Sequence, residues 1–253
     1  MRVVLFSRAP GWYSFKGDRF VTRLAREHHE VVGIVVERRK LLAFLRDWVG
    51  KLGPQVVVGK LMEKVLRRGG ASNGAVASPS DGSPAAAPVP LPPVYRVDSH
   101  NSPASADILR ALEPDVLILR GCGIIRKPIL DIPKRGVING HYAFLPAYRG
   151  VDVTEWAVLH GDPPAVSVHF VNEGVDTGAT LAARELPVAP GDTLGRLREK
   201  SAGLSLDLMV EVLNDLEAGR EVPPPARKPG GRQYYKMHPR LRQLASERLR
   251  SVL

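Results

Sequence analysis

Three polar residues in the middle of the sequence have the types and spacing that a group-transfer site needs. Asn139 ends an apolar run, His141 stands two residues further on, and Asp176 lies in the glycine-flanked segment 174–178. An amide and an imidazole that leave a strand end in the same direction can both donate hydrogen bonds to one oxygen. A carboxylate on a tight turn can reach the imidazole and favour its charged form. We therefore predict a site where Asn139 and His141 bind a developing oxyanion beside Asp176.

Each of these residues also has an ordinary structural explanation. An asparagine at a strand end often forms a turn, and a lone histidine is often a hydrogen-bonded core residue. An aspartate between glycines often belongs to an Asx turn. These explanations weaken because the three residues occur together with the connecting segment Leu145-Pro-Ala-Tyr-Arg-Gly150. The combination favours a functional site.

The elements that would position this site alternate between strands and helices. Apolar and β-branched runs predict buried strands, and segments with helical spacing lie between several of them. The predicted strands cover residues 2–6, 31–36, 94–97, 115–119, 136–139, 165–171 and 179–188. The predicted helices cover residues 15–27, 105–112 and 193–216, the last with Asp192 as its N-cap. This order predicts an α/β protein with a doubly wound, Rossmann-like and mostly parallel sheet, which binds ligands beyond the carboxyl ends of its strands.

Two segments interrupt the alternation. Residues 38–68 are basic and apolar together and predict a helical insertion, which we interpret as a flap over one edge of the sheet. Docking on a membrane surface or an acidic substrate is the alternative. Residues 69–93 are rich in Gly, Ala, Ser and Pro and predict a mobile loop, because they cannot bury enough surface to offset their chain entropy.

The chain is thus expected to hold one catalytic domain over residues 1–219. The remaining residues, 220–253, predict a basic, Pro- and Arg-rich tail that is not a separate domain. Tyr234 and Tyr235 are candidate anchors for this tail, and a short basic helix is expected at its end.

The motifs resemble those of the folate-dependent formyltransferases, which include methionyl-tRNA formyltransferase, glycinamide ribonucleotide formyltransferase and sugar N-formyltransferases. That family carries Asn-x-His, then Leu-Pro-x-(Tyr/Phe)-Arg-Gly, then an Asp in a (Val/Leu)-Asp-x-Gly loop. Here these motifs read Asn139-Gly-His141, Leu145-Pro-Ala-Tyr-Arg-Gly150 and Val175-Asp-Thr-Gly178. The resemblance covers residues 94–218 well and the first strand–helix–strand unit loosely. Ala143-Phe144 stands where many relatives have Ser-Leu, which predicts a different pocket shape with unchanged chemistry.

The resemblance implies an N-formyltransferase with 10-formyltetrahydrofolate as formyl donor. Asn139 and a protonated His141 would stabilise the oxyanion, while Asp176 would keep His141 charged and help to remove a proton from the attacking amine. Cys122 is expected to line the folate pocket and not to act as a nucleophile, because nothing near it in the sequence would lower its pKa. By position, the folate-binding residues are Cys122, Gly123, Ile124, Ile125, Val171, Asn172 and Glu173.

The acceptor amine is expected to be a small molecule. The segment 7–14 lacks the Gly-rich phosphate loop of the glycinamide ribonucleotide enzymes. After Gly219 a short tail stands where methionyl-tRNA formyltransferase has a β-barrel that helps to bind tRNA. An amino sugar, a nucleotide-linked amino sugar or a specialised metabolite fits better than tRNA. Tyr148 and Arg149 are the candidate acceptor-binding residues, and Trp156 is expected to pack in the core.

The composition is that of a globular protein of 253 residues, 44% of them hydrophobic. The sequence shows no membrane span and no signal peptide. It contains one cysteine and no Cys/His cluster at zinc-ligand spacing, so we expect a cytoplasmic protein without a metal. The net charge of +10 indicates an acidic partner, such as nucleic acid, a phosphorylated substrate or a folate with its glutamate tail, or else only a solvated surface.

Two other functions remain open. A 10-formyltetrahydrofolate hydrolase would pass the formyl group to water with the same three residues, although such relatives usually carry an N-terminal regulatory domain. A non-catalytic binder would use the basic segment 38–68 and would show salt-sensitive binding. The intact triad argues against the binder. The sequence does not specify an oligomeric state.

Overall fold

The computed structural model describes residues 1–8, 19–38, 92–220 and 231–252. Met1–Glu37 and Leu91–Leu253 belong to one compact unit, and Arg38–Pro90 forms a second. The second unit lies outside the described residues except for its first residue. The predicted helical insertion over residues 38–68 and nearly all of the predicted loop over residues 69–93 therefore fall outside them too.

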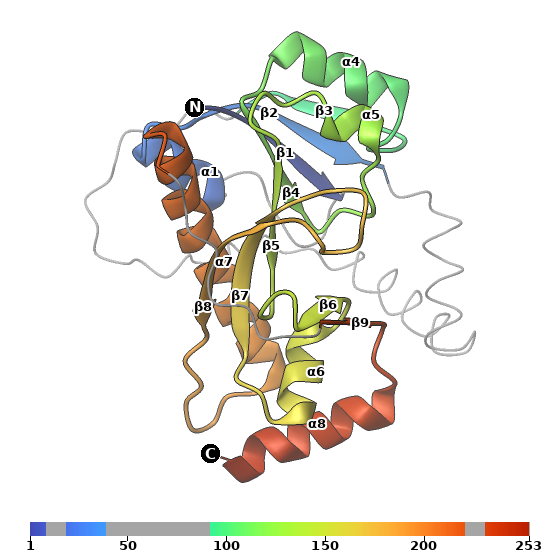
Figure 1. Ribbon diagram of the computed structural model, residues 1–253, viewed down its shortest axis with the longest axis vertical. Helices are drawn as coiled ribbons and strands as arrows, with labels where there is room; N and C mark the ends of the chain where they lie inside the picture. The colour runs from blue at the N-terminus through green and yellow to red at the C-terminus, as the bar shows by residue number, and fades with distance from the viewer. Residues whose placement is uncertain (9–18, 39–91, 221–230, 253) are drawn as a thin grey trace, which may run out of the picture. The chain divides into compact units, whose positions relative to one another are not determined.

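A seven-stranded sheet with the order β3-β2-β1-β4-β5-β7-β8 forms the centre of the first unit (Figure 1). Pairing is parallel from β3 through β5, whereas β7 pairs antiparallel with both β5 and β8. This confirms the predicted Rossmann-like, mostly parallel sheet, and the reversal at β7 is an addition to it. The strands are β1 (Arg2–Arg8), β2 (Glu30–Glu37), β3 (Val94–Val97), β4 (Val116–Arg120), β5 (Val137–His141), β7 (Ala165–Phe170) and β8 (Thr180–Glu185).

Six described helices and one small sheet accompany it. The helices are α1 (Arg19–Arg26), α4 (Pro103–Leu112), α5 (Lys127–Leu130), α6 (Val153–His160), α7 (Leu194–Glu217) and α8 (Pro239–Val252). The small sheet pairs β6 (Tyr148–Gly150) in parallel with β9 (Arg232–Tyr234), and both strands lie close to α6 (Figure 1). None of the helices in the described part of the chain is long and apolar enough to cross a membrane.

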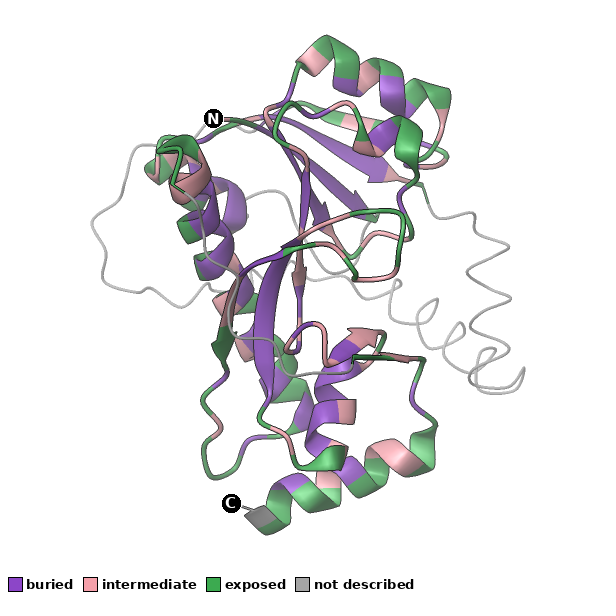
Figure 2. Cartoon of the chain, in the orientation of Figure 1, coloured by how far each residue is buried: buried purple, intermediate pink, exposed green. Residues whose placement is uncertain are grey.

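Two hydrophobic cores lie on opposite faces of the large sheet. Val3 and Leu5 of β1 pack into the core that contains α1 and α7. Val4 and Phe6 pack into the core that contains α4 and α5. Because side chains alternate along a strand, a strand covered on both faces is buried throughout, as Figure 2 shows for the centre of the sheet. The site residues at the end of β5 therefore stand on a rigid support.

The N-cap of helix α7 is Thr193, and the predicted N-cap Asp192 is wrong. The Thr193 hydroxyl accepts a hydrogen bond from the Arg196 N–H at 3.1 Å, and its extended backbone suits an N-cap. The Asp192 carboxylate instead accepts the Ala189 N–H at 2.8 Å and pairs with Lys200.

Candidate active site

His141 is the last residue of β5, whereas Asn139 lies two residues before the end and not at it, where the sequence had predicted it. Asp176 reaches both from the loop between β7 and β8. Asp176 Oδ2 lies 3.6 Å from His141 Nδ1, close enough for charge interaction but too far for a direct hydrogen bond. His141 is 6% exposed. The structure thus brings His141 and Asp176 together as the sequence predicted, and Asn139 joins them through a fourth residue.

That fourth residue is His169 of β7, which was not among the site residues predicted from the sequence. It pairs directly with Asn139 across the antiparallel β5–β7 ladder. Its Nε2 lies 3.4 Å from Asn139 Nδ2 and 3.6 Å from Asp176 Oδ1. Its Nδ1 lies 2.8 Å from the Phe170 carbonyl oxygen, which can only accept, so Nδ1 carries a proton. Burial lowers the pKa of His169, which favours the neutral ring whose Nε2 accepts the Asn139 N–H.

His141 is oriented by the backbone of β6. Its Nε2 lies 2.6 Å from the Tyr148 carbonyl oxygen, so Nε2 carries the proton of that hydrogen bond. The other ring nitrogen, Nδ1, faces Asp176. Only Nδ1 is therefore left to exchange protons with bound reactants.

Burial and Asp176 have opposite effects on the charge of His141. Burial lowers the pKa of His141 and outweighs Asp176 and the Tyr148 carbonyl, both of which raise it. The lowered pKa favours the neutral ring, with a lone pair on Nδ1, and the protonated His141 expected from the sequence stays a prediction.

Asp176 is held in a constrained position. Its φ of 50° lies in the left-handed region, which Asp tolerates better than most residues. Its Oδ2 accepts the Gly150 N–H at 2.8 Å. The side chain is 18% exposed, so the carboxylate is fixed by the protein yet open to a small reactant.

A cavity of about 250 Å³ adjoins His141. The Arg198 guanidinium on its wall is paired with Asp152 and Glu155, and Arg242 pairs with Asp152 as well, so these charges balance. The lining residues are Gly140, His141, Tyr142, Gly150, Val151, Asp152, Val153, Thr154, Glu155 and Arg198.

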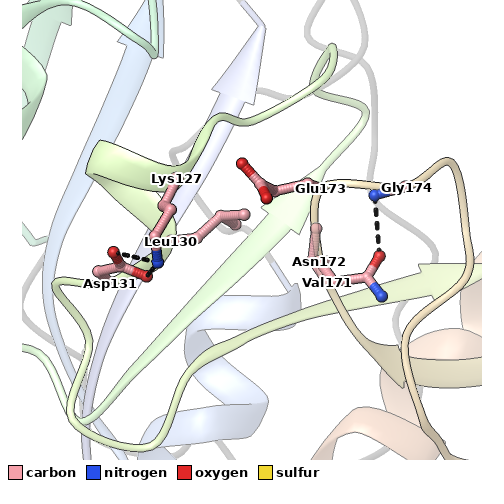
Figure 3. A pocket seen from close by; sticks show the side chains of 7 residues that line it. All are labelled: Lys127, Leu130, Asp131, Val171, Asn172, Glu173 and Gly174. Carbon is pink, nitrogen blue, oxygen red and sulfur yellow. Dashed lines mark hydrogen bonds and ion pairs between the residues drawn. The ribbon is translucent and has the colours of Figure 1, made fainter.

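A second cavity, of about 430 Å³, lies between α5 and the loop after β7 (Figure 3). Asn172 Oδ1 stabilises that loop by accepting the Gly174 N–H at 3.0 Å and the Thr177 hydroxyl at 2.7 Å. The lining residues are Lys127, Leu130, Asp131, Val171, Asn172, Glu173 and Gly174.

The predicted folate residues divide between this cavity and its surroundings. Val171, Asn172 and Glu173 line it, whereas those of residues 122–125 do not. Ile125 is buried in the core against which Cys122 and Val171 pack, so the two predicted folate loops are neighbours. Gly123 follows Cys122 in the first of these loops, and Ile124 is exposed. Burial raises the pKa of the Cys122 thiol to about 12, which argues against a nucleophilic role for it.

The side chains of Tyr148 and Trp156 face the C-terminal segment. The Tyr148 hydroxyl donates to Asp162 at 2.6 Å, and Trp156 Nε1 donates to the Tyr235 carbonyl at 2.9 Å. Neither Tyr148 nor Arg149 lines the cavity beside His141. Acceptor binding by these two residues stays a prediction, and the packing role of Trp156 agrees with its contacts.

With this geometry in place, comparison with known proteins defines the class. Residues 62–213 match the family model described as Formyl transferase, which is more than half of the 253 residues. The chain therefore belongs to the formyl transferase family.

Individual relatives place the chain within that family. The methionyl-tRNA formyltransferase of Syntrophus aciditrophicus is 34% identical over 128 residues, which are 50% of this chain and 41% of that protein. Glycinamide ribonucleotide transformylase 1 from Symbiobacterium toebii shares the fold with a TM-score of 0.58 at 21% identity, covering 87% of this chain and 88% of its own. The formyltransferase PseJ from Anoxybacillus kamchatkensis also shares the fold, with a TM-score of 0.50 at 17% identity. The match covers 93% of this chain and 86% of PseJ, whose structure was solved with UDP-4,6-dideoxy-4-formamido-L-AltNAc and tetrahydrofolate.

The match to the relatives by sequence is partial. This chain spans about two fifths of the length of the curated methionyl-tRNA formyltransferases it matches. The substrates of those longer proteins therefore do not define the substrate of this chain. Within the described residues, no group of three His, Cys, Asp or Glu side chains is arranged to hold a metal ion.

Proposed function

We propose that this protein transfers a formyl group from 10-formyltetrahydrofolate to the amine of a small molecule. The observation that carries the proposal is the meeting of Asn139, His141 and Asp176 at the end of β5 in a member of the formyl transferase family. The tetrahydrofolate bound in the PseJ structure supports the same donor. The donor supplies an activated formyl carbon attached to a nitrogen that can leave.

The proposed chemistry follows from the hydrogen bonds of the two ring nitrogens of His141. The neutral ring uses Nδ1 to accept a proton as the amine attacks the formyl carbon. The imidazolium formed in this way lies beside Asp176, whose charge stabilises it. It returns the proton to the departing folate nitrogen, so one carbon–nitrogen bond forms, another breaks, and no net proton is gained.

Asn139 has the complementary role of an oxyanion donor. One N–H of its amide is directed at His169 Nε2, which fixes the plane of the amide. Because the amide is planar, this bond also fixes the direction of the second N–H, which donates to the formyl oxygen as negative charge develops. Losing one such donor typically costs about 3 kcal/mol of transition-state stabilisation.

The cavity between α5 and the loop after β7 suits the folate pterin. Its volume of about 430 Å³ lies in the range of small-molecule sites. Leu130 and Val171 supply apolar wall for a flat ring, and the turn at Asn172 to Gly174 supplies backbone polar groups for its edge. These residues would bind and orient the donor.

A small amine fits the cavity beside His141, whose volume is about 250 Å³. Its paired charges favour a polar acceptor without a large excess of charge. Formylation of methionyl-tRNA is the second candidate, because the relatives by sequence are enzymes of that name and the chain carries a net charge of +10.

The first test is incubation with 10-formyltetrahydrofolate and a panel of amines. The panel comprises amino sugars, nucleotide-linked amino sugars, other small amines and methionyl-tRNA, with tetrahydrofolate release and product mass as readouts. We expect one small amine to gain one formyl group. Formate release without an amine would favour the hydrolase, and absence of folate turnover would refute the proposed function.

Salt dependence separates the two acceptor classes. With a small amine, kcat/KM should change only weakly between 50 and 200 mM salt, whereas a protein making 6–10 phosphate contacts loses roughly 10³-fold or more in affinity over that range. A steep loss with methionyl-tRNA, together with its formylation, would establish the second candidate.

A further inference from the structure

Strand β6 lies between the proposed catalytic residues and the C-terminal segment. Its Tyr148 carbonyl lies 2.6 Å from His141 Nε2, and its Gly150 N–H donates to Asp176 at 2.8 Å. Both contacts come from the backbone of the same three-residue strand. The position of β6 thus sets the orientation of the His141 ring and the Asp176 carboxylate together.

The other edge of β6 is covered by β9. Tyr148 pairs with Arg232, and Gly150 with Tyr234. The Val151 N–H extends the ladder by donating to the Tyr234 carbonyl at 3.1 Å. Among the described strands β6 pairs with β9 alone, and an isolated two-stranded sheet is marginally stable in water.

At Gly150 the backbones of β6 and β9 lie close together. Its φ is 105°, and a Cβ added there would lie 2.0 Å from the Tyr234 carbonyl oxygen. Only glycine allows this approach without a backbone shift. The residue that donates to Asp176 is therefore also the residue pressed against Tyr234.

Side chains hold the two strands together. The Tyr234 ring stacks on Tyr148 with centroids 5.1 Å apart and an interplanar angle of 22°. Its centroid lies 5.3 Å from that of Trp156, whose Nε1 donates to the Tyr235 carbonyl. Such aromatic pairs contribute beyond the area they bury. The Tyr235 side chain is 71% exposed.

We propose that the C-terminal segment Arg232–Val252 positions His141 and Asp176 through β6, and that Tyr234 is its principal positioning residue. Tyr234 touches no reactant in this scheme. It keeps β6 in register, and β6 keeps the proton-accepting Nδ1 of His141 facing Asp176. This inference rests on the proposed formyl transfer for its kinetic consequences, but the link between β9 and β6 can be measured without it.

The kinetic test compares three variants of the full chain. Tyr234→Ala removes the stack on Tyr148, Tyr234→Phe keeps the ring, and Tyr235→Ala removes the neighbouring tyrosine ring, which is exposed. We expect Tyr234→Ala to lower kcat roughly tenfold to a hundredfold, because small misplacements of catalytic groups carry costs of that size. The KM for 10-formyltetrahydrofolate should stay within about twofold, since only transition-state contacts are altered. Tyr234→Phe and Tyr235→Ala should behave like the unmodified protein.

The structural test is hydrogen exchange of the Gly150 amide, which needs no activity. We expect faster exchange in Tyr234→Ala and unchanged exchange in Tyr235→Ala. Asp176→Asn replaces the charged acceptor of the Gly150 N–H by an amide oxygen, so it is the reference for a weakened Gly150 bond. If the unmodified protein turns over no folate, the proposed function fails, while the exchange data still decide the link from β9 to β6.

Two results would overturn the inference. One is a folded Tyr234→Ala variant with unchanged kcat and unchanged Gly150 exchange. The other is an equal kcat loss in Tyr235→Ala, which would point to a general effect of the tail. Should Tyr234→Ala not fold, Trp156→Phe removes the N–H bonded to the Tyr235 carbonyl and replaces the indole that packs on Tyr234 by a smaller ring. It must then show the same direction of change in kcat and in Gly150 exchange.

Discussion

His141 has two acceptors at unequal distances, and this difference determines its chemistry. The Tyr148 carbonyl at 2.6 Å takes the Nε2 proton, whereas Asp176 at 3.6 Å interacts with Nδ1 only through charge. A neutral ring with a lone pair on Nδ1 is suited to accept a proton. Nδ1 becomes a hydrogen-bond donor only after it has accepted that proton.

Replacing Asp176 by asparagine tests this assignment. The variant keeps an oxygen for the Gly150 N–H and a residue type that tolerates the φ of 50°, so the fold should persist. The charge that stabilises the imidazolium is lost, and kcat should fall at least about a hundredfold. The measurements are kcat with the identified acceptor and the thermal unfolding midpoint. Normal turnover in a folded Asp176→Asn protein would rule out the proposed proton transfer.

His169 carries a sequence signal, although the predicted site did not include it. It is the only ionisable residue in the strand Ala165–Phe170, and an imidazole in an otherwise apolar or small strand has to find a partner. The partner became visible only with the antiparallel register, which sets His169 opposite Asn139. Strand direction depends on a connection around the sheet, and no local pattern encodes it.

A double-mutant cycle measures the coupling of these two residues. His169→Phe keeps an aromatic ring but removes the acceptor for the Asn139 amide. We expect kcat to fall roughly tenfold, as the loss of about one hydrogen bond implies. Asn139→Ala should lower kcat by more, and the double variant should match Asn139→Ala. Fully additive effects would show that His169 acts independently of Asn139.

At the scale of elements, long patterns were predictable and short ones were not. The predicted strand 31–36 lies within β2 (Glu30–Glu37), and helix α7 differs from the predicted 193–216 by one residue at each end. These segments carry continuous apolar runs or several turns of periodic spacing. Strands β6 and β9 have three residues each, and helices α5 and α6 were missed as well. A three-residue strand exists because of its partner, which here lies far along the chain.

Asp152 links helices α6, α7 and α8 through two ion pairs, so its contribution to stability can be measured by substitution. It precedes α6, pairs with Arg198 of α7 and Arg242 of α8, and accepts the Met237 N–H. Its side chain is only 9% exposed, although both arginines are about two fifths exposed. Asp152→Ala should lower the free energy of unfolding by about 2 kcal/mol, less than a fully buried pair because solvent screens the arginines.

Urea unfolding gives that value. Asp207→Ala, at an exposed position of α7, is the matched control and should change the free energy by less than about 0.5 kcal/mol. An equal loss in the two variants would show that Asp152 is not a special junction.

The molecule as a whole should lose stability on mild acidification. Burial lowers the pKa of His29, His100, His141 and His169 below the ordinary value of 6.5. The unfolded chain therefore binds protons more readily than the folded one once the pH falls below 6.5. The contribution of these neutral rings is complete above that pH and is lost as the pH falls toward their folded pKa values.

Urea unfolding at pH 7.5 and 5.5 measures this loss, and the free energy of unfolding should be smaller at pH 5.5. Removing one of the four rings in His100→Gln should make the difference smaller. Equal stability of the unmodified protein at the two pH values would mean that the buried histidines titrate as they do in the unfolded chain.

The pairing of Tyr148 with Arg232 also has a consequence for how the protein is made. A ribosome adds about 5–20 residues per second, and domains form as their segments emerge. Asn139, His141, His169 and Asp176 all leave the ribosome well before β9. If the C-terminal segment has the proposed role, a nascent chain contains all four of these side chains but lacks the strand that positions them until β9 is made. Full activity would then be acquired late in translation, and an incomplete chain would consume little of the formyl donor.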